Sequence, residues 1–216
     1  MEEFKNRVQA AEALSKKLSD YRGKNPLILG IPRGAVPMAQ VLAQQLHGDL
    51  DVVLVHKISA PENPEFAIGS VSEFGTVTIS EVAYLCEVPP GYLQKAADSE
   101  IHRLREKRKW ISPVRPALSP KNRIVIIVDD GIATGSTMLA AVRAIRAQKP
   151  KRLIVAAPMG SPKAMDRFRQ EIDELVVLEA PESFYSISQF YEDFPQVTDD
   201  EVLQILAQAS KNQKAA

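Results

Sequence analysis

The sequence predicts an α/β protein in which a parallel sheet is flanked by helices. Short apolar runs alternate along the chain with segments of helical periodicity, first near residue 30 and again near residue 125. The runs are continuously apolar, as in strands that are buried on both faces, and polar residues follow where the runs end. This alternation is typical of a parallel sheet whose carboxyl edge carries the functional loops.

The composition is that of an ordinary globular protein. The 216 residues include 27 Lys and Arg and 27 Asp and Glu, so the formal net charge is zero, and 45% of the residues are hydrophobic. Zero net charge argues against a dedicated nucleic-acid binder, which needs clustered positive charge. The single cysteine, Cys86, cannot form an internal disulfide, and no apolar run approaches the roughly 20 residues of a membrane span. We therefore expect a cytoplasmic protein that makes no contact with a membrane, and one domain over residues 1–216.

The first half of the chain opens with a helix and a strand–helix–strand unit. Apolar residues at steps of three and four predict the first helix, and Pro37 suits the first turn of the next one. The expected elements are a helix over 2–21, a strand over 27–31, a helix over 37–46 and a strand over 51–57. Residues 58–80 are then broken by Pro and Gly, with a hairpin over 71–79 about Phe74 and Gly75.

The second half restarts the alternation after an insertion over about 58–120. Within this insertion, residues 92–110 are predicted to form a charged helix, and residues 58–80 a lid or a dimer arm. The expected elements that follow are strands over 123–128, 152–157 and 175–178, and helices over 136–148, 161–170 and from Asp199. An aromatic tail over about 180–216 is expected to form a small C-terminal hood.

The most informative stretch follows the apolar run over 124–128. Two adjacent carboxylates, Asp129 and Asp130, come first, and a turn rich in small and hydroxyl residues leads into a helix. Backbone N–H groups of such a turn can hold a phosphate, aided by the helix dipole. The carboxylates would repel that phosphate, so vicinal sugar hydroxyls, with or without a metal ion, are their natural partner. The chain has no Walker A loop and no G-x-G-x-x-G after a strand.

The string VDDGIATGST over 128–137 resembles the signature of the type I phosphoribosyltransferases, which bind phosphoribosyl pyrophosphate (PRPP). The resemblance implies that Asp129 and Asp130 hold the ribose 2′- and 3′-hydroxyls, and that they contact a Mg²⁺ ion brought by PRPP. It also implies a 5′-phosphate site in the turn that follows. The PRPP-binding residues expected in this stretch are Asp129, Asp130, Gly131, Ala133, Thr134, Gly135, Ser136 and Thr137.

A second stretch is similar to the pyrophosphate-binding loop of the same family. It contains Pro32, Arg33 and Gly34, and Lys57 matches a basic position at the end of the next strand. Together with residues 56–71, these motifs resemble a less characterised branch of the family. The resemblance implies transfer of a phosphoribosyl group to a nucleobase or related nitrogen acceptor, with release of pyrophosphate, by a homodimer. Arg33 and Lys57 would then be catalytic together with the two aspartates, because cations stabilise the charge that develops on the leaving group.

The acceptor stays open. In relatives that act on 6-oxopurines the position of Ala133 is typically an Asp, which makes hypoxanthine or guanine a less favoured acceptor here. Phe184 and Tyr185 are candidates for stacking on a planar acceptor, or else they pack the small hood.

An alternative function is a PRPP-binding regulatory or RNA-binding protein with little or no catalysis. The basic run over 102–110 is the candidate for RNA binding. Such a run is more typical of a solvated helix face or of a contact between subunits.

Overall fold

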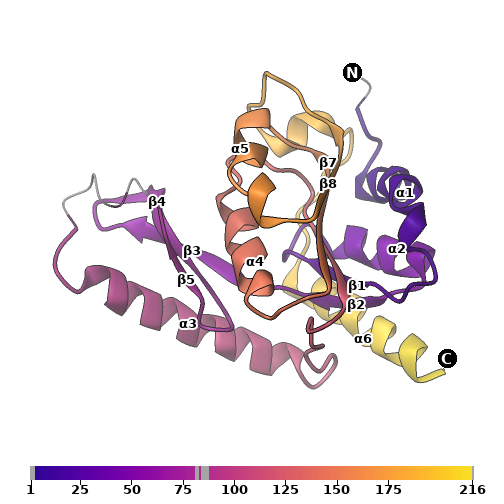
Figure 1. Cartoon of the computed structure of the whole chain (residues 1–216), viewed down its shortest axis with the longest axis horizontal. Helices are drawn as coiled ribbons and strands as arrows, with labels where there is room; N and C mark the ends of the chain where they lie inside the picture. Colours follow the sequence, from indigo (N-terminus) through magenta and orange to yellow (C-terminus); the bar gives the residue numbers. More distant parts are fainter. Residues whose placement is uncertain (1–2, 81–82, 84–87, 216) are drawn as a thin grey trace.

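The computed structural model describes residues 3–80, 83 and 88–215, so Cys86 lies outside the described residues. It contains a five-stranded parallel sheet and a separate three-stranded antiparallel sheet. In Figure 1 the parallel sheet and its helices form one body, from which the antiparallel sheet and the long helix α3 extend to the left. The predicted fold class, a parallel sheet flanked by helices with an insertion, is confirmed.

The parallel sheet has the strand order β2-β1-β6-β7-β8. Its strands are β1 (Leu27–Gly30), β2 (Asp49–Val52), β6 (Ile124–Val128), β7 (Arg152–Met159) and β8 (Glu174–Glu179). The central neighbours are β1 and β6, with Gly30 opposite Val128. From β1 the chain proceeds to one edge of the sheet, and from β6 it proceeds to the other. The reversal of strand order lies between β1 and β6, and ligands bind at the carboxyl ends of the strands at such a point in open α/β sheets.

Helices cover both faces of the parallel sheet. One face packs against α1 (Arg7–Lys17), α2 (Val36–Leu46) and α6 (Asp199–Ala215), and the other against α4 (Ser136–Arg146) and α5 (Pro162–Asp166). Alternate residues of β1 serve the two cores: Ile28 lies in the first core, and Leu27 and Leu29 lie in the second. This division explains the continuously apolar sequence of the strand.

The insertion forms the antiparallel sheet and α3. Its strands are β3 (Val55–Ala60), β4 (Asn63–Ser72) and β5 (Val77–Ile79), and α3 spans Tyr92–Ile111. The hairpin predicted about Phe74 and Gly75 is confirmed, and Gly75 adopts a positive φ of 84° there. Within the part of the chain that the structure describes, every helix is too short or too polar to cross a bilayer.

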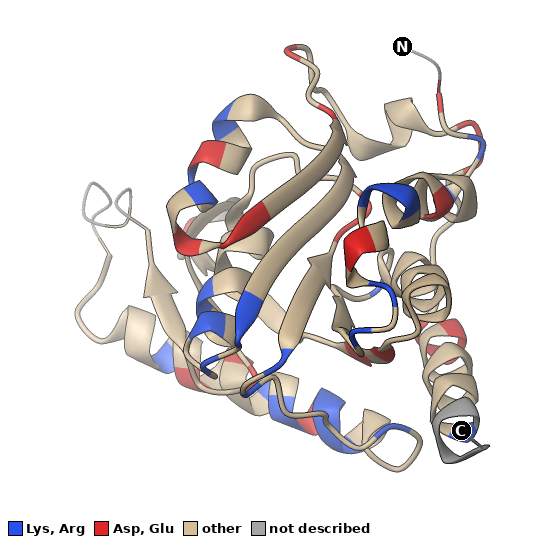
Figure 2. Cartoon of the chain, turned by 45° about the vertical axis from the view of Figure 1, so that its right-hand side comes forward, with Lys and Arg blue, Asp and Glu red and all other residues tan. Residues whose placement is uncertain are grey.

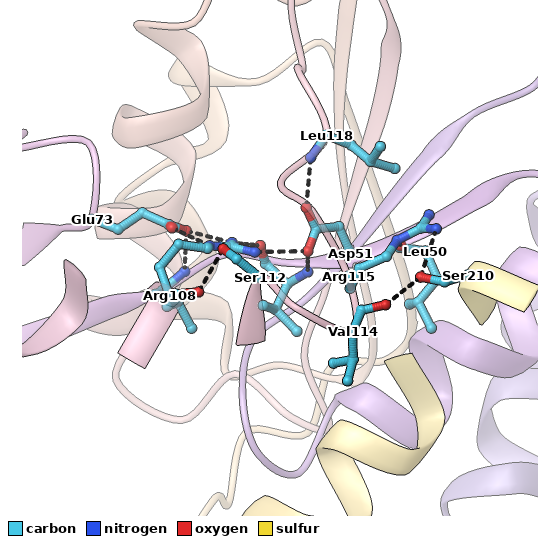
Figure 3. Close-up of polar contacts among 11 residues, drawn as sticks. Leu50, Asp51, Glu73, Arg108, Ser112, Val114, Arg115, Leu118 and Ser210 are labelled. Carbon is cyan, nitrogen blue, oxygen red and sulfur yellow. Dashed lines mark hydrogen bonds and ion pairs between the residues drawn. The ribbon is translucent and has the colours of Figure 1, made fainter. Parts of the chain in front are cut away.

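A buried ion network ties the insertion to the parallel sheet (Figure 3). Arg108 on α3 donates to Asp51 of β2 over 2.9 Å and to Glu73 of the hairpin turn over 2.8 Å. The Asp51 carboxylate also accepts from the backbone N–H of Leu118 at 2.9 Å. The Arg108 side chain is only 13% exposed, so its charge is compensated inside the protein.

The single strand predicted over 51–57 is wrong, because the chain changes sheet inside it. After β2 the chain leaves the parallel sheet at Val53 and Leu54, and Leu54 accepts a hydrogen bond from the Glu73 N–H at 3.0 Å. Val53 and Leu54 are both buried, so the sequence stays apolar where the chain changes sheet and gives no sign of that change. Lys57 therefore lies in the antiparallel sheet and does not end a parallel strand.

Two predicted helices are shorter than expected. The first begins at Arg7, because Asn6 caps it by accepting from Gln9 N–H at 3.1 Å, while Phe4 forms a parallel bridge with Tyr191. The helix predicted over 161–170 ends at Asp166. Short 3₁₀ helices among the described residues include η1 (Ser19–Tyr21), η3 (Arg169–Glu171) and η4 (Ile187–Phe190).

Candidate functional site

Two loops meet at the carboxyl edge of the parallel sheet. One follows β1 and contains residues 32–34, and the other follows β6 and contains residues 129–137. They start side by side because β1 and β6 are hydrogen-bonded neighbours, and the N–H of Ile31 still donates to the Val128 carbonyl at 3.1 Å. The two stretches that the sequence singled out thus lie side by side at the same edge of the sheet.

The backbone of the first loop, which contains a cis peptide bond between Pro32 and Arg33, lies against a carboxylate of the second. A Cβ atom built on Gly34 would lie 2.1 Å from Oδ2 of Asp130, so only a glycine fits between the loop and this side chain. Gly34 is therefore needed for the close approach of the two loops rather than for an unusual φ angle.

The two adjacent carboxylates lie in a poorly solvated place. Burial raises the pKa of Asp129 well above its ordinary value, and the charge of Asp130 raises it further, whereas the Lys57 ammonium opposes the shift. Burial also raises the pKa of Asp130, against the charge and hydrogen bonds of Arg7. Lys57, on β3, is thus the predicted cation whose charge acts on Asp129.

The turn before α4 is closely packed at its glycine. Gly135 adopts φ 73°, and a Cβ atom there would lie 2.6 Å from the Ala164 carbonyl oxygen, so this position requires glycine. Ala133 and Thr134 are exposed, and α4 begins at Ser136. At the start of the helix, the Ser136 N–H donates to Thr134 Oγ1 at 3.5 Å.

A cation that the sequence reasoning missed lies on this turn. Arg167 donates from Nη1 to the Thr134 carbonyl at 2.8 Å and to Ser136 Oγ at 3.0 Å. Ser161 Oγ also donates to the Ala133 carbonyl at 3.1 Å. Arg167 follows α5 in an ordinary charged segment, so no local pattern in the sequence could have found it.

Arg33 and Lys57 are the cations that the sequence singled out. The Arg33 side chain is 48% exposed and forms an ion pair with Asp199 at 3.7 Å, in the first turn of α6. Lys107 of α3 also pairs with Asp199, at 3.0 Å. Such an exposed ion pair is weak, so an anionic ligand can displace Asp199 from Arg33 at little cost.

The aromatic part of the tail, residues 184–194, forms a hood at this edge, whereas α6 packs on one face of the sheet. Phe184 packs on Phe190 with ring centroids 5.0 Å apart, whereas Tyr185 is 88% exposed. Tyr191 lies closer to the carboxylates, and its hydroxyl donates to the backbone carbonyl of Asp130 at 2.8 Å. Phe184 therefore contributes to packing within the hood, and the acceptor contacts expected of Phe184 and Tyr185 stay predictions.

Much of the positive charge of the basic run over 102–110 on α3 is compensated by ion pairs. Figure 2 shows acidic residues between the basic ones on this helix. The ion pairs of the run are Arg103 with Glu100, Lys107 with Asp199, Arg108 with Asp51 and Glu73, and Lys109 with Glu106. This compensation weakens the argument for RNA binding at α3.

The chain's own residues offer only part of a metal site. Among residues 3–80, 83 and 88–215, no group of three His, Cys, Asp or Glu side chains is placed to hold a metal ion. The carboxylates of Asp129 and Asp130 are nevertheless hard oxygen donors, which suit Mg²⁺ when a phosphate ligand supplies further oxygens. The donor set thus fits an ion that is shared with a ligand.

Comparison with known proteins agrees with this geometry. The model of the phosphoribosyl transferase domain family matches residues 1–195. Protein TT1426 of Thermus thermophilus has a solved structure with a TM-score of 0.84 and 38% identity, over 96% of this chain and 99% of that one. Protein AQ2163 of Aquifex aeolicus, with a TM-score of 0.52 and 12% identity over 93% and 85% of the two chains, shares the fold alone.

Curated relatives are longer than this chain. A Mycobacterium tuberculosis protein named "Putative phosphoribosyl transferase" is 34% identical over 98% of this chain and 48% of its own length. Nearly the whole of this chain is matched, but it spans only about half the length of these curated relatives. Since the family model covers nearly the whole chain, including both loops at the carboxyl edge of the sheet, this chain belongs to the phosphoribosyl transferase family.

Proposed function

We propose that this protein is a phosphoribosyltransferase that binds PRPP with Mg²⁺ and transfers the phosphoribosyl group to a nucleobase or related nitrogen acceptor. One observation carries the proposal. Two adjacent carboxylates, a hydroxyl-rich turn at a helix start and the loop at Gly34 lie together at the carboxyl edge of β1 and β6. These are the groups that a sugar bearing a phosphate at one end and a pyrophosphate at the other requires.

The sugar and its 5′-phosphate would be held by the second loop. Asp129 and Asp130 would accept hydrogen bonds from the ribose hydroxyls, which are strong because the acceptors are charged. The 5′-phosphate would lie on the turn over 133–137, where backbone N–H groups and the dipole of α4 favour an anion. Arg167, which already holds this turn, adds a positive charge beside it.

The pyrophosphate would lie by the first loop. In the reaction the bond from C1′ to the pyrophosphate oxygen breaks, its electron pair leaves with the pyrophosphate, and the acceptor nitrogen bonds to C1′ and loses a proton. Arg33 and Lys57 would stabilise the negative charge that develops on the leaving group. Asp129 and Asp130 would help to hold Mg²⁺ brought by PRPP, and the ion would supply further neutralisation of that charge.

The acceptor stays the open part of this proposal. Purines, pyrimidines and non-nucleobase amines all have a reactive nitrogen, and Phe184 and Tyr185 are the proposed contacts to a planar ring. Residues 58–80, which we propose act as a lid, would exclude water from the reacting sugar. This segment forms most of the antiparallel sheet beside the site.

The proposal is tested by titration calorimetry with PRPP and Mg²⁺. The wild type should bind, and Asp129→Asn should weaken binding by about 10- to 100-fold, because a hydrogen bond to a charged acceptor is lost. Asp98→Asn, which changes an exposed aspartate on α3, is the matched control. A wild type that does not bind PRPP would overturn the proposal.

Turnover is measured separately, as pyrophosphate release with purine, pyrimidine and amine acceptors in turn. Release with one acceptor class supports the enzyme and identifies that class. Binding of PRPP without release in any of the three classes would instead support the regulatory alternative.

A further inference from the structure

A buried cation outside both sequence motifs lies beside Asp130. We propose that Arg7, on the first helix, is a positioning residue that orients the Asp130 carboxylate toward the ribose of PRPP. This inference rests on the proposed function. It adds a residue that lies 123 positions away from Asp130 in the chain.

The guanidinium of Arg7 is held by three hydrogen bonds and by contact with an aromatic ring. Its Nε and Nη2 atoms both donate to Oδ2 of Asp130, at 3.1 and 3.0 Å, and Nη1 donates to the Pro195 carbonyl at 2.7 Å. The guanidinium carbon also lies 3.7 Å from the centroid of the Phe194 ring. Because the Arg7 side chain is only 9% exposed, this cation has no freedom to follow another partner.

This arrangement orients the carboxylate. Both bonds from Arg7 end on Oδ2, which also faces the backbone of Gly34. Oδ1 is then the oxygen that Arg7 does not use, and it is the atom we assign to a ribose hydroxyl. A carboxylate without Arg7 would rotate about its Cβ–Cγ bond and present either oxygen.

Asp130 is held at its backbone as well. Tyr191 donates to the Asp130 carbonyl, and the hood segment that carries Tyr191 pairs with the N-terminal segment. In that pairing, Phe4 N–H donates to the Phe190 carbonyl at 2.8 Å. The first helix and the hood thus fix one residue of the sugar site from two directions, in a way that the local motif cannot.

The two aspartates also have different cationic partners. The Lys57 ammonium acts on Asp129, whereas Arg7 pairs with Asp130. Lys57 is one of the cations proposed to contact the leaving group, whereas the Arg7 side chain is only 9% exposed and all three of its nitrogens donate hydrogen bonds within the protein. Arg7 therefore acts on the substrate through Asp130 and not by direct contact.

The test measures three ligands separately by calorimetry: PRPP, ribose 5-phosphate and inorganic pyrophosphate. Arg7→Met should weaken PRPP and ribose 5-phosphate by about tenfold or more, since an unpaired carboxylate loses its orientation, and should leave pyrophosphate within about twofold. Arg7→Lys keeps the charge and should regain part of the loss. It also keeps the series interpretable where Arg7→Met does not fold.

The matched control is Arg143→Met. Arg143 also donates from Nε and Nη2 to one carboxylate, that of Glu171, and lies on α4 away from its first turn. This variant should bind all three ligands as the wild type does.

Three results would overturn the inference. The first is unchanged affinity for ribose 5-phosphate in Arg7→Met, and the second is an increase, which would mean that Arg7 competes with the sugar. The third is an equal loss of all three ligands together with a lower melting temperature, which would mean a purely structural role. A wild type that binds neither PRPP nor ribose 5-phosphate overturns the proposed function itself.

Discussion

Gly34→Ala tests the close approach of the two loops that form the site. The added methyl group would lie 2.1 Å from Asp130 Oδ2, and a contact shorter than 3.0 Å forces something to move. The carboxylate cannot give way freely because two N–H groups of Arg7 hold the same oxygen. The substitution therefore pushes the loop away from Asp130 or breaks the buried ion pair.

The expected cost follows from two opposing contributions. Overpacking of a well-packed site costs about 1–3 kcal/mol. Replacing glycine by alanine also restricts the unfolded chain, which returns about 0.4–1 kcal/mol. Taking the middle of each range, the net loss in the free energy of unfolding of Gly34→Ala is roughly 1.3 kcal/mol, or a fall in melting temperature of about 3–5 °C for a chain of this size.

The assay is urea denaturation followed by far-ultraviolet circular dichroism, carried out as a double-mutant cycle with Asp130→Ala. In the Asp130→Ala background the clashing oxygen is gone, so Gly34→Ala should be neutral or stabilise by up to about 1 kcal/mol. A Gly34→Ala protein as stable as the wild type would refute the reasoning. An identical loss in both backgrounds would do the same, because the clash would then lie elsewhere.

Three further changes test other parts of the structure. Arg108→Met leaves two buried carboxylates uncompensated and should cost about 3–5 kcal/mol in urea denaturation, and a loss below about 1 kcal/mol would contradict the network. Burial and the hydrogen bond to Glu174 raise the pKa of Tyr21 from 10.0 to about 12, so the stability contributed by the neutral hydroxyl is present below pH 10 and lost as the pH rises through 12. Tyr21→Phe should remove that alkaline loss in denaturation curves compared across this range. Arg167→Gln should weaken PRPP binding by about tenfold in calorimetry, whereas Arg169→Gln, two residues away, should not.

Much of the parallel sheet could be predicted because its signals are local. The runs over 27–31 and 124–128 are each continuously apolar, as expected of strands that are buried on both faces of a sheet. Polar residues follow each run. The helices predicted over 37–46 and 136–148 correspond to α2 over 36–46 and α4 over 136–146. Boundaries failed where tertiary contacts decide them, as at Val53 and Leu54, where the chain changes sheet inside one apolar run.

The two loops of the candidate site were also readable from the sequence. Asp129, Asp130 and the hydroxyl-rich turn lie within ten consecutive residues, and the family signature is local. Adjacent placement of this turn and the loop at Gly34 required the strand order, because only neighbouring strands bring their carboxyl ends together.

The sequence by itself thus determined the fold class, the position of the hydroxyl-rich turn before α4 and the pair of carboxylates, because each depends on residues close together in the chain. The tertiary structure decided which cation faces which carboxylate. Arg7 reaches Asp130 from the first helix, Arg167 reaches the turn from beyond α5, and Lys57 acts on Asp129 from the antiparallel sheet. Such pairings depend on how helices and sheets pack across long separations in sequence, and no local pattern of residues encodes them.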